Sequence, residues 1–155
     1  MERSILGFHG DEAGDWVAEL DCGHSQHVRH RPPFDNRPWT TTEPRRRAKL
    51  GQRLACPNCD HFEMPDGCRA YKRTPEFDAS SIPDGLRKAH STKPGVWAKL
   101  HVLEGRLRYI VQPPLAREFL LEPATSGIIV PEILHHIEPL GSVRFYVEFY
   151  QRPTF

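Results

Sequence analysis

The sequence predicts a mostly β protein, and three observations support this prediction. Fifteen prolines and eleven glycines occur among 155 residues, and such frequent turn formers favour short strands over helical bundles. Few long apolar runs repeat with the period of a helix. Short apolar runs alternate instead with turn-forming stretches, which is typical of antiparallel sheets. The length suits one ordinary domain or two small ones.

The first strands are expected to form a small three-stranded antiparallel sheet. Apolar residues are dense at 4–8 and at 16–20, and the stretch between them is rich in turn formers, which predicts a hairpin. A third strand is expected over 26–31, because Pro32 and Pro33 then stop the pairing.

A short helix should follow this sheet. It opens at Thr42-Glu43-Pro44 and runs through Leu50. Thr42 can cap the helix, Pro44 is tolerated in its first turn, and Gly51 can end it.

The spacing of the cysteines indicates a metal site. No secretory signal is recognisable at the start of the sequence, so metal ligation or free thiols are favoured over disulfides. In the CxxC turn of Cys56 and Cys59, two thiolates can converge on one ion while backbone amides donate to the sulfurs. The turn Cys22-Gly23-His24 resembles a second such knuckle. We therefore predict a structural zinc site formed by Cys22, His24, Cys56 and Cys59.

Alternatives to this ligand set remain open at the level of sequence. His27 is the reserve for the fourth ligand, and His30 also lies close enough to compete. The CxxC pair could instead be a redox pair or an unliganded turn, although no βαβ pattern of the thioredoxin kind surrounds it. Cys68 is expected to be a small buried residue and not a ligand.

Basic residues around the knuckle suggest a second possibility, a face for nucleic acid. They are interleaved with Phe34 and Trp39, and arginine with aromatic side chains can contact phosphates and bases. The net charge of +1 and the nearby acidic residues favour a solvated charged surface instead. A regulator whose knuckle binds nucleic acid or protein is therefore an alternative function. The basic residues are Arg29, Arg31, Arg37, Arg45, Arg46, Arg47, Lys49 and Arg53.

The chain is expected to divide into a small β zinc-knuckle domain at 1–60, a linker at 61–75 and a larger β domain at 76–155. In the last part, two strands are expected to meet at Glu104-Gly105, followed by strands near 118–121, 127–131, 135–138 and 143–150. Such a run of short strands separated by turns predicts a sandwich or barrel.

Two motifs in this second half resemble the cupin family. They are Val102-Leu103-Glu104-Gly105 and Val130-Pro131-Glu132-Ile133-Leu134-His135. The stretch from His90 through Phe149 is more narrowly similar to the TehB/YeaR-like cupin family of tellurite-resistance proteins, over roughly residues 76 to 152. The front half looks like an uncharacterised small domain that precedes such cupins in some bacterial proteins. The resemblance implies a cupin-type β-barrel, a double-stranded β-helix.

The resemblance also implies a metal in the barrel. His90 and His135 fall on motif histidines, whereas the usual motif glutamate position falls at about Ala98. His101 should face outward by strand parity, so Glu148 is expected to be the third ligand of a divalent zinc, iron or nickel ion. Core positions of the barrel are expected to be Trp97, Leu100, Val102, Ile129, Phe145 and Val147.

From these features we expect a metal-binding cupin-like protein that acts in a tellurite, oxyanion or related stress response by binding a small ligand or metal. The alternative is a cupin metalloenzyme, a dioxygenase or isomerase in which Tyr109 or Tyr146 assists proton transfer. No apolar stretch has the length of a membrane span, so we expect a cytoplasmic protein without a membrane partner. Pairing of exposed sheet edges into a homodimer is possible. The sequence names neither the substrate nor the barrel metal.

Overall fold

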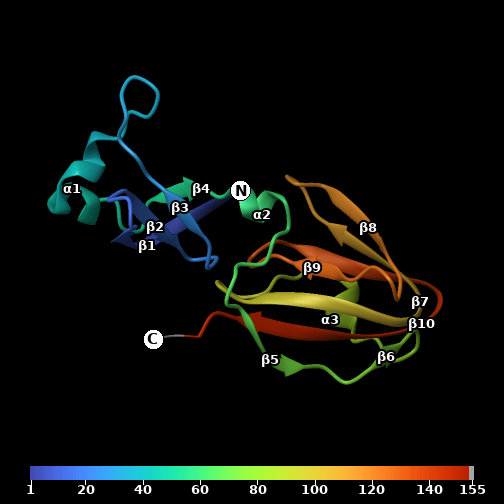
Figure 1. Ribbon diagram of the computed structural model, residues 1–155. Helices are drawn as coiled ribbons and strands as arrows, with labels where there is room; N and C mark the ends of the chain where they lie inside the picture. Colours follow the sequence, from blue (N-terminus) through green and yellow to red (C-terminus); the bar gives the residue numbers. More distant parts are fainter. Residues whose placement is uncertain (154–155) are drawn as a thin grey trace. The chain divides into compact units, whose positions relative to one another are not determined.

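The computed structural model describes residues 1–153 and is mostly β, as predicted (Figure 1). The chain forms two compact units, one from Met1 to Asp66 and one that begins at Gly67. No helix among the described residues is long and apolar enough to cross a membrane.

The first unit is built on a four-stranded sheet of order β3-β2-β1-β4. The predicted hairpin is confirmed, because β1 (Glu2–Gly10) pairs antiparallel with β2 (Trp16–Leu20). The third strand, β3 (Ser25–His27), is shorter than expected. The predicted count of three strands is wrong, because β4 (Arg53–Ala55) pairs with the other edge of β1.

Three short helical segments complete the first unit. They are the 3₁₀ segment η1 (Pro38–Thr41), α1 (Glu43–Arg47) and α2 (Pro57–Asp60). Thr42 occupies the N-cap position of α1, as predicted, but its side chain makes no capping hydrogen bond. The helix ends at Arg47, before the predicted Leu50. α2 follows Cys56 directly and contains Cys59.

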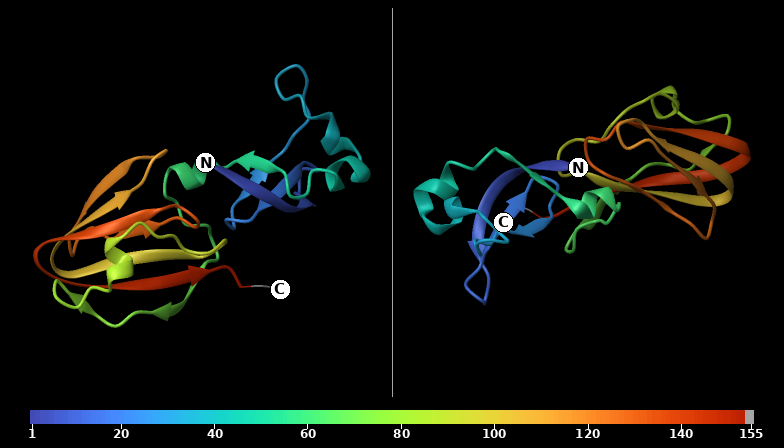
Figure 2. Two further views of the ribbon diagram at one scale, coloured as in Figure 1. Left: turned by 180° about the vertical axis from the view of Figure 1, so that it is seen from behind. Right: turned by 90° about the horizontal axis from the view of Figure 1, so that it is seen from above.

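The second unit is organised by two long antiparallel strands, β7 (Trp97–Val111) and β10 (His135–Gln151). Figures 1 and 2 show them side by side through the middle of a curled sheet. On the other edge of β7 lie β9 (Gly127–Ile129) and β8 (Arg117–Leu121). On the other edge of β10 lie β5 (Arg69–Arg73) and β6 (Phe77–Asp78), and α3 (Asp84–Arg87) is the helix of this unit. The stretch 61–75, expected as a linker, thus contains a strand of the sheet.

The sequence predicted a break at Glu104-Gly105, and this prediction is wrong because β7 is continuous through it. The glycine has a positive φ of 79°. A Cβ at Gly105 would lie 2.0 Å from the carbonyl oxygen of Ser142. Glycine therefore allows β7 to bend against the backbone of β10 where the register between the strands shifts. It keeps the two strands paired instead of ending them.

The core of the second unit lies on one face of these two strands. All six predicted core positions, Trp97, Leu100, Val102, Ile129, Phe145 and Val147, are buried. The core of the first unit is much smaller. Its buried aliphatic side chains are Ile5, Val17, Ala18, Leu20 and Val28.

Candidate metal centre and histidine pair

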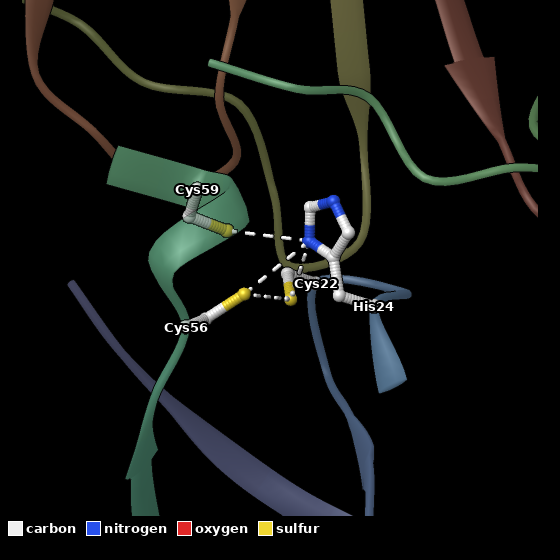
Figure 3. A group of neighbouring side chains, drawn as sticks. All are labelled: Cys22, His24, Cys56 and Cys59. Atoms are coloured by element: carbon white, nitrogen blue, oxygen red, sulfur yellow. Dashed lines mark hydrogen bonds between the residues drawn. The ribbon is translucent and has the colours of Figure 1, made fainter. Parts of the chain in front are cut away.

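Two turns at the same end of the first unit's sheet, one after β2 and one after β4, bring four metal-ligating side chains together. Cys22 and His24 lie in the turn between β2 and β3, while Cys56 and Cys59 lie at the start and on the body of α2. Figure 3 shows the four side chains pointing toward one another. All four residues are buried, and their ligand atoms lie within 4.8 Å of one another. We call this group the Cys3His cluster.

The distances within the Cys3His cluster match those of a tetrahedral zinc site. Nδ1 of His24 lies 3.3 Å, 3.4 Å and 3.6 Å from the sulfurs of Cys22, Cys56 and Cys59. The sulfurs of Cys22 and Cys56 are 3.8 Å apart. With Zn–S of about 2.3 Å and Zn–N of about 2.0 Å, a tetrahedron has S···S edges of about 3.8 Å and S···N edges of about 3.5 Å. The four side chains can therefore hold a metal ion such as zinc.

Backbone and side-chain amides donate to or approach the sulfurs of the cluster. The amide of His24 donates to the sulfur of Cys22, and the amide of Cys59 donates to the sulfur of Cys56. The side-chain amide of Gln26 also approaches the sulfur of Cys56, at 3.7 Å. Gln26 carries no sequence signal for this role, because it reaches the cluster only through the pairing of β3 with β2. These donors favour the thiolate form that a metal requires.

The thiols of the cluster differ strongly in how readily they lose their protons. Hydrogen bonds from Cys22 and Cys59 lower the pKa of the Cys56 thiol, and the same sharing raises the pKa of Cys22. Burial acts to lower the pKa of His24, but the thiolates beside it raise that pKa to about 9. A second and third thiolate would repel the first, so full deprotonation of the three thiols requires a cation among them.

The two other histidines considered for this site lie elsewhere. Nε2 of His27 is 3.2 Å from Asp11, and this histidine is 52% exposed. Nδ1 of His30 accepts a hydrogen bond from the backbone of Arg37. His24 is therefore the histidine that completes the Cys3His cluster.

Several of the basic residues near the knuckle have acidic or aromatic partners in the structure. Arg29 and Arg31 both pair with Asp15, and Arg47 pairs with Glu43. The guanidinium of Arg46 lies 3.6 Å from the centre of the Trp16 ring. These contacts match the solvated charged surface better than a free phosphate-binding face.

In the second unit, the structure brings His90 and His135 together. They form an antiparallel backbone bridge, and their ring centroids lie 4.3 Å apart. Both line a cavity of about 360 Å³. Burial lowers the pKa of His135 to about 4, so its imidazole is neutral at physiological pH.

Glu148 does not join the two histidines. It is paired with Lys99 in the register of the sheet, one residue from the inward Val147, so it lies on the opposite face. There it accepts hydrogen bonds from Tyr150 and from His101, which lower its pKa. Among the described residues, the Cys3His cluster is the one group of three or more close metal-ligating side chains. The expected three-ligand barrel site is not formed.

The two tyrosines considered for proton transfer do not line the cavity, although the ring of Tyr109 lies 5.5 Å from that of the lining residue His135. The hydroxyl of Tyr109 donates to the backbone oxygen of Ile128, and burial raises its pKa above the usual range. Tyr146 stacks on His101, on the outer face of the sheet.

The fold and the cluster define a mostly β protein of two units, the first of which can hold a metal ion. Residues 6–63 match a family described as "Protein of unknown function (DUF3565)", and residues 72–147 match the TehB-like domain. These matches, with the relatives below, support a TehB-like family for the second unit.

Two curated relatives are similar to part of the chain. Two proteins from strains of Haemophilus influenzae, each named a probable S-adenosyl-L-methionine-dependent methyltransferase TehB, are 28% and 27% identical over 75 residues. The match covers 46% of this chain and 26% of each relative. The chain therefore spans about a quarter of the length of these relatives.

Solved structures are also similar to part of the chain. The crystal structure of TehB from H. influenzae has a TM-score of 0.52 at 25% identity and covers 56% of this chain and 32% of its own. A protein from E. coli (strain K12) has a TM-score of 0.55 at 24% identity and covers 59% of this chain and 98% of its own. The E. coli protein shares the fold.

Proposed function

We propose that the first unit is stabilised by one structural zinc ion bound by the Cys3His cluster. The observation that supports this most directly is the agreement of four interatomic distances with the edges of a zinc tetrahedron. Four protein ligands leave no coordination position for a substrate or an activated water, so the ion is structural. Because the apolar core of this unit is small, a metal cross-link contributes a large share of its stability.

The zinc content of the purified full-length chain tests this proposal. We expect one equivalent in the wild type and loss of that zinc in Cys56→Ser and in His24→Ala. Cys68→Ser is the matched control, because Cys68 is a free cysteine outside the cluster. Zinc retained in both cluster variants, or lost equally in Cys68→Ser, would contradict the proposal.

For the second unit we propose a cupin-type barrel that binds a small ligand in the cavity beside His90 and His135. Cavities of small-molecule sites measure roughly 300–1,000 Å³, and this one measures about 360 Å³. The likeness to TehB suggests a tellurite-type oxyanion as one ligand class and a stress response as the role. A metalloenzyme receives less support, because Glu148 lies on the other face of the sheet.

Amide chemical shifts of isotope-labelled, zinc-loaded protein test the proposed ligand site. Tellurite and a set of small organic acids and alcohols are added one at a time. We expect at least one of them to shift the amide signals of cavity residues such as Ser91, Thr92 and Val96. If no compound moves these signals, the small-ligand function is wrong.

A further inference from the structure

The walls of the cavity in the second unit are largely apolar. They come mainly from β7, β9 and β10 and from the segment before β7, with further residues from β5 and α3. Removing these side chains from water requires a ligand with apolar surface of its own. An inorganic oxyanion would leave them in contact with water. The apolar lining includes Val96, Leu100, Ile129, Ile137, Val147 and Phe149.

His135, which lines this cavity, has a buried hydrogen-bond acceptor without a partner. His135 is 1% exposed, and Nδ1 of its ring lies 2.9 Å from the carbonyl oxygen of Ile133. Because a carbonyl oxygen only accepts, Nδ1 carries the proton and Nε2 presents a lone pair. Nε2 is buried and makes no hydrogen bond. A buried polar atom left unpaired is costly, so this atom indicates a missing hydrogen-bond donor.

His90 repeats this arrangement beside His135. Its Nδ1 lies 2.9 Å from the carbonyl oxygen of Lys88, so its Nε2 is also the acceptor nitrogen. Backbone hydrogen bonds of 2.9 Å and 3.0 Å hold the two histidines in register. The two neighbouring histidines, both of which line the cavity, therefore each have an acceptor nitrogen. No carboxylate or thiolate joins them among the described residues, which favours a ligand hydroxyl or N–H group over a metal ion.

The charged residues of the cavity are both cationic. Lys72 on β5 and Lys93 before β7 line it and are exposed. No acidic residue occurs among the described residues of the lining. The lysines oppose a cationic ligand such as an amine and attract an anionic group.

We infer that this cavity binds a small organic anion with an apolar body and a hydroxyl or N–H group, with that donor bonded to Nε2 of His135 and the anionic group near Lys72 and Lys93. The inference rests on the proposed small-ligand function of the second unit and specifies the ligand class.

Calorimetric titration of the zinc-loaded full chain with three related probes tests the inference. 4-Hydroxyphenylacetate has a ring, a hydroxyl and a carboxylate, whereas phenylacetate lacks the hydroxyl and 4-methylphenol lacks the carboxylate. We expect 4-hydroxyphenylacetate to bind roughly tenfold or more tightly than either analogue, because a site built for a hydroxyl discriminates against ligands that lack it.

Variants of two adjacent histidines assign the hydroxyl preference. His135→Phe should abolish the preference for 4-hydroxyphenylacetate over phenylacetate. His136→Phe is the matched control and should preserve it, because His136 bonds Gln112 and Glu138 outside the cavity lining. The ¹⁵N resonance of His135 Nε2 in the wild type should also shift when 4-hydroxyphenylacetate is added. If His135→Phe fails to fold, the ¹⁵N resonance of the wild type tests whether the ligand bonds to Nε2 of His135.

The contrary results distinguish failure of this inference from failure of the proposed small-ligand function. Equal binding of 4-hydroxyphenylacetate and phenylacetate, or an unmoved His135 Nε2 resonance, overturns the inference. If tellurite binds and the three organic probes do not, the inference fails while the proposed small-ligand function stands. If neither tellurite nor any organic compound binds, both fail.

Discussion

Withdrawing zinc from the Cys3His cluster is expected to unfold residues 1–66. Cys22 and Cys56 are 34 positions apart in the sequence. A cross-link that closes a loop of this length restricts the unfolded chain by about 4 kcal/mol at 25 °C. Small domains are stable by roughly 5 kcal/mol or somewhat more, and the first unit buries only a few aliphatic side chains. Loss of the cross-link therefore removes most of the unit's stability.

Two-dimensional amide spectra before and after treatment with EDTA measure this effect. We expect the signals of residues 1–66 to collapse into the narrow range of unfolded chains, while those of residues 67–153 keep their dispersion and serve as the internal reference. Adding zinc back should restore the first set. If metal analysis shows zinc-free protein while the signals of residues 1–66 stay in place, the reasoning is refuted.

Two further predictions concern the second unit. Gly105→Ala should lower the free energy of unfolding by roughly 3 kcal/mol in urea titrations, because its Cβ would meet the oxygen of Ser142. Gly141→Ala has the same φ of 79° but open space around it, so it should cost only about 1 kcal/mol; equal losses would refute the role of the close approach. Burial lowers the pKa of His135 in the folded protein to about 4, whereas the same histidine in the unfolded chain has a pKa of about 6.5. Between these two values the unfolded chain binds more protons than the folded protein. The free energy of unfolding should therefore fall by about 3 kcal/mol as the pH drops from about 6.5 to about 4. His135→Phe should remove this part of the acid sensitivity and His136→Phe should retain it; identical pH profiles for both variants would count against a buried neutral His135.

The convergence of the four Cys3His side chains could be predicted because its geometry is mostly local. The CxxC turn and the Cys-x-His turn each place two ligands within a few residues, so the sequence alone indicates which side chains converge. Only the choice among His24, His27 and His30 depended on tertiary structure. β3 ends at His27, whose side chain turns to Asp11 instead of the cluster.

The expectation that Glu148 joins His90 and His135 as a metal ligand failed for a different reason. The sequence predicts separate strands at 135–138 and 143–150, and the alternation of faces cannot be counted across a break between strands. β10 is in fact continuous over this stretch. Strand parity from an inward His135 places Glu148 on the outer face.

Lys72 was missed as a cavity residue because it lies in the stretch expected to be a linker. The pairing of β5 with β10 depends on contacts between residues far apart in the chain. In this pairing Lys72 lies opposite Phe149. A short exposed strand carries no apolar alternation that would reveal such a pairing in advance. Long-range pairings of this kind are where the sequence was least informative.

X-ray absorption at the zinc edge of the purified protein tests the proposed Cys3His zinc site, because it identifies the atoms around the metal. We predict one zinc with three sulfur neighbours at about 2.3 Å and one nitrogen at about 2.0 Å. A first shell of oxygen and nitrogen alone, or protein purified without zinc that keeps the fold of residues 1–66, would contradict it.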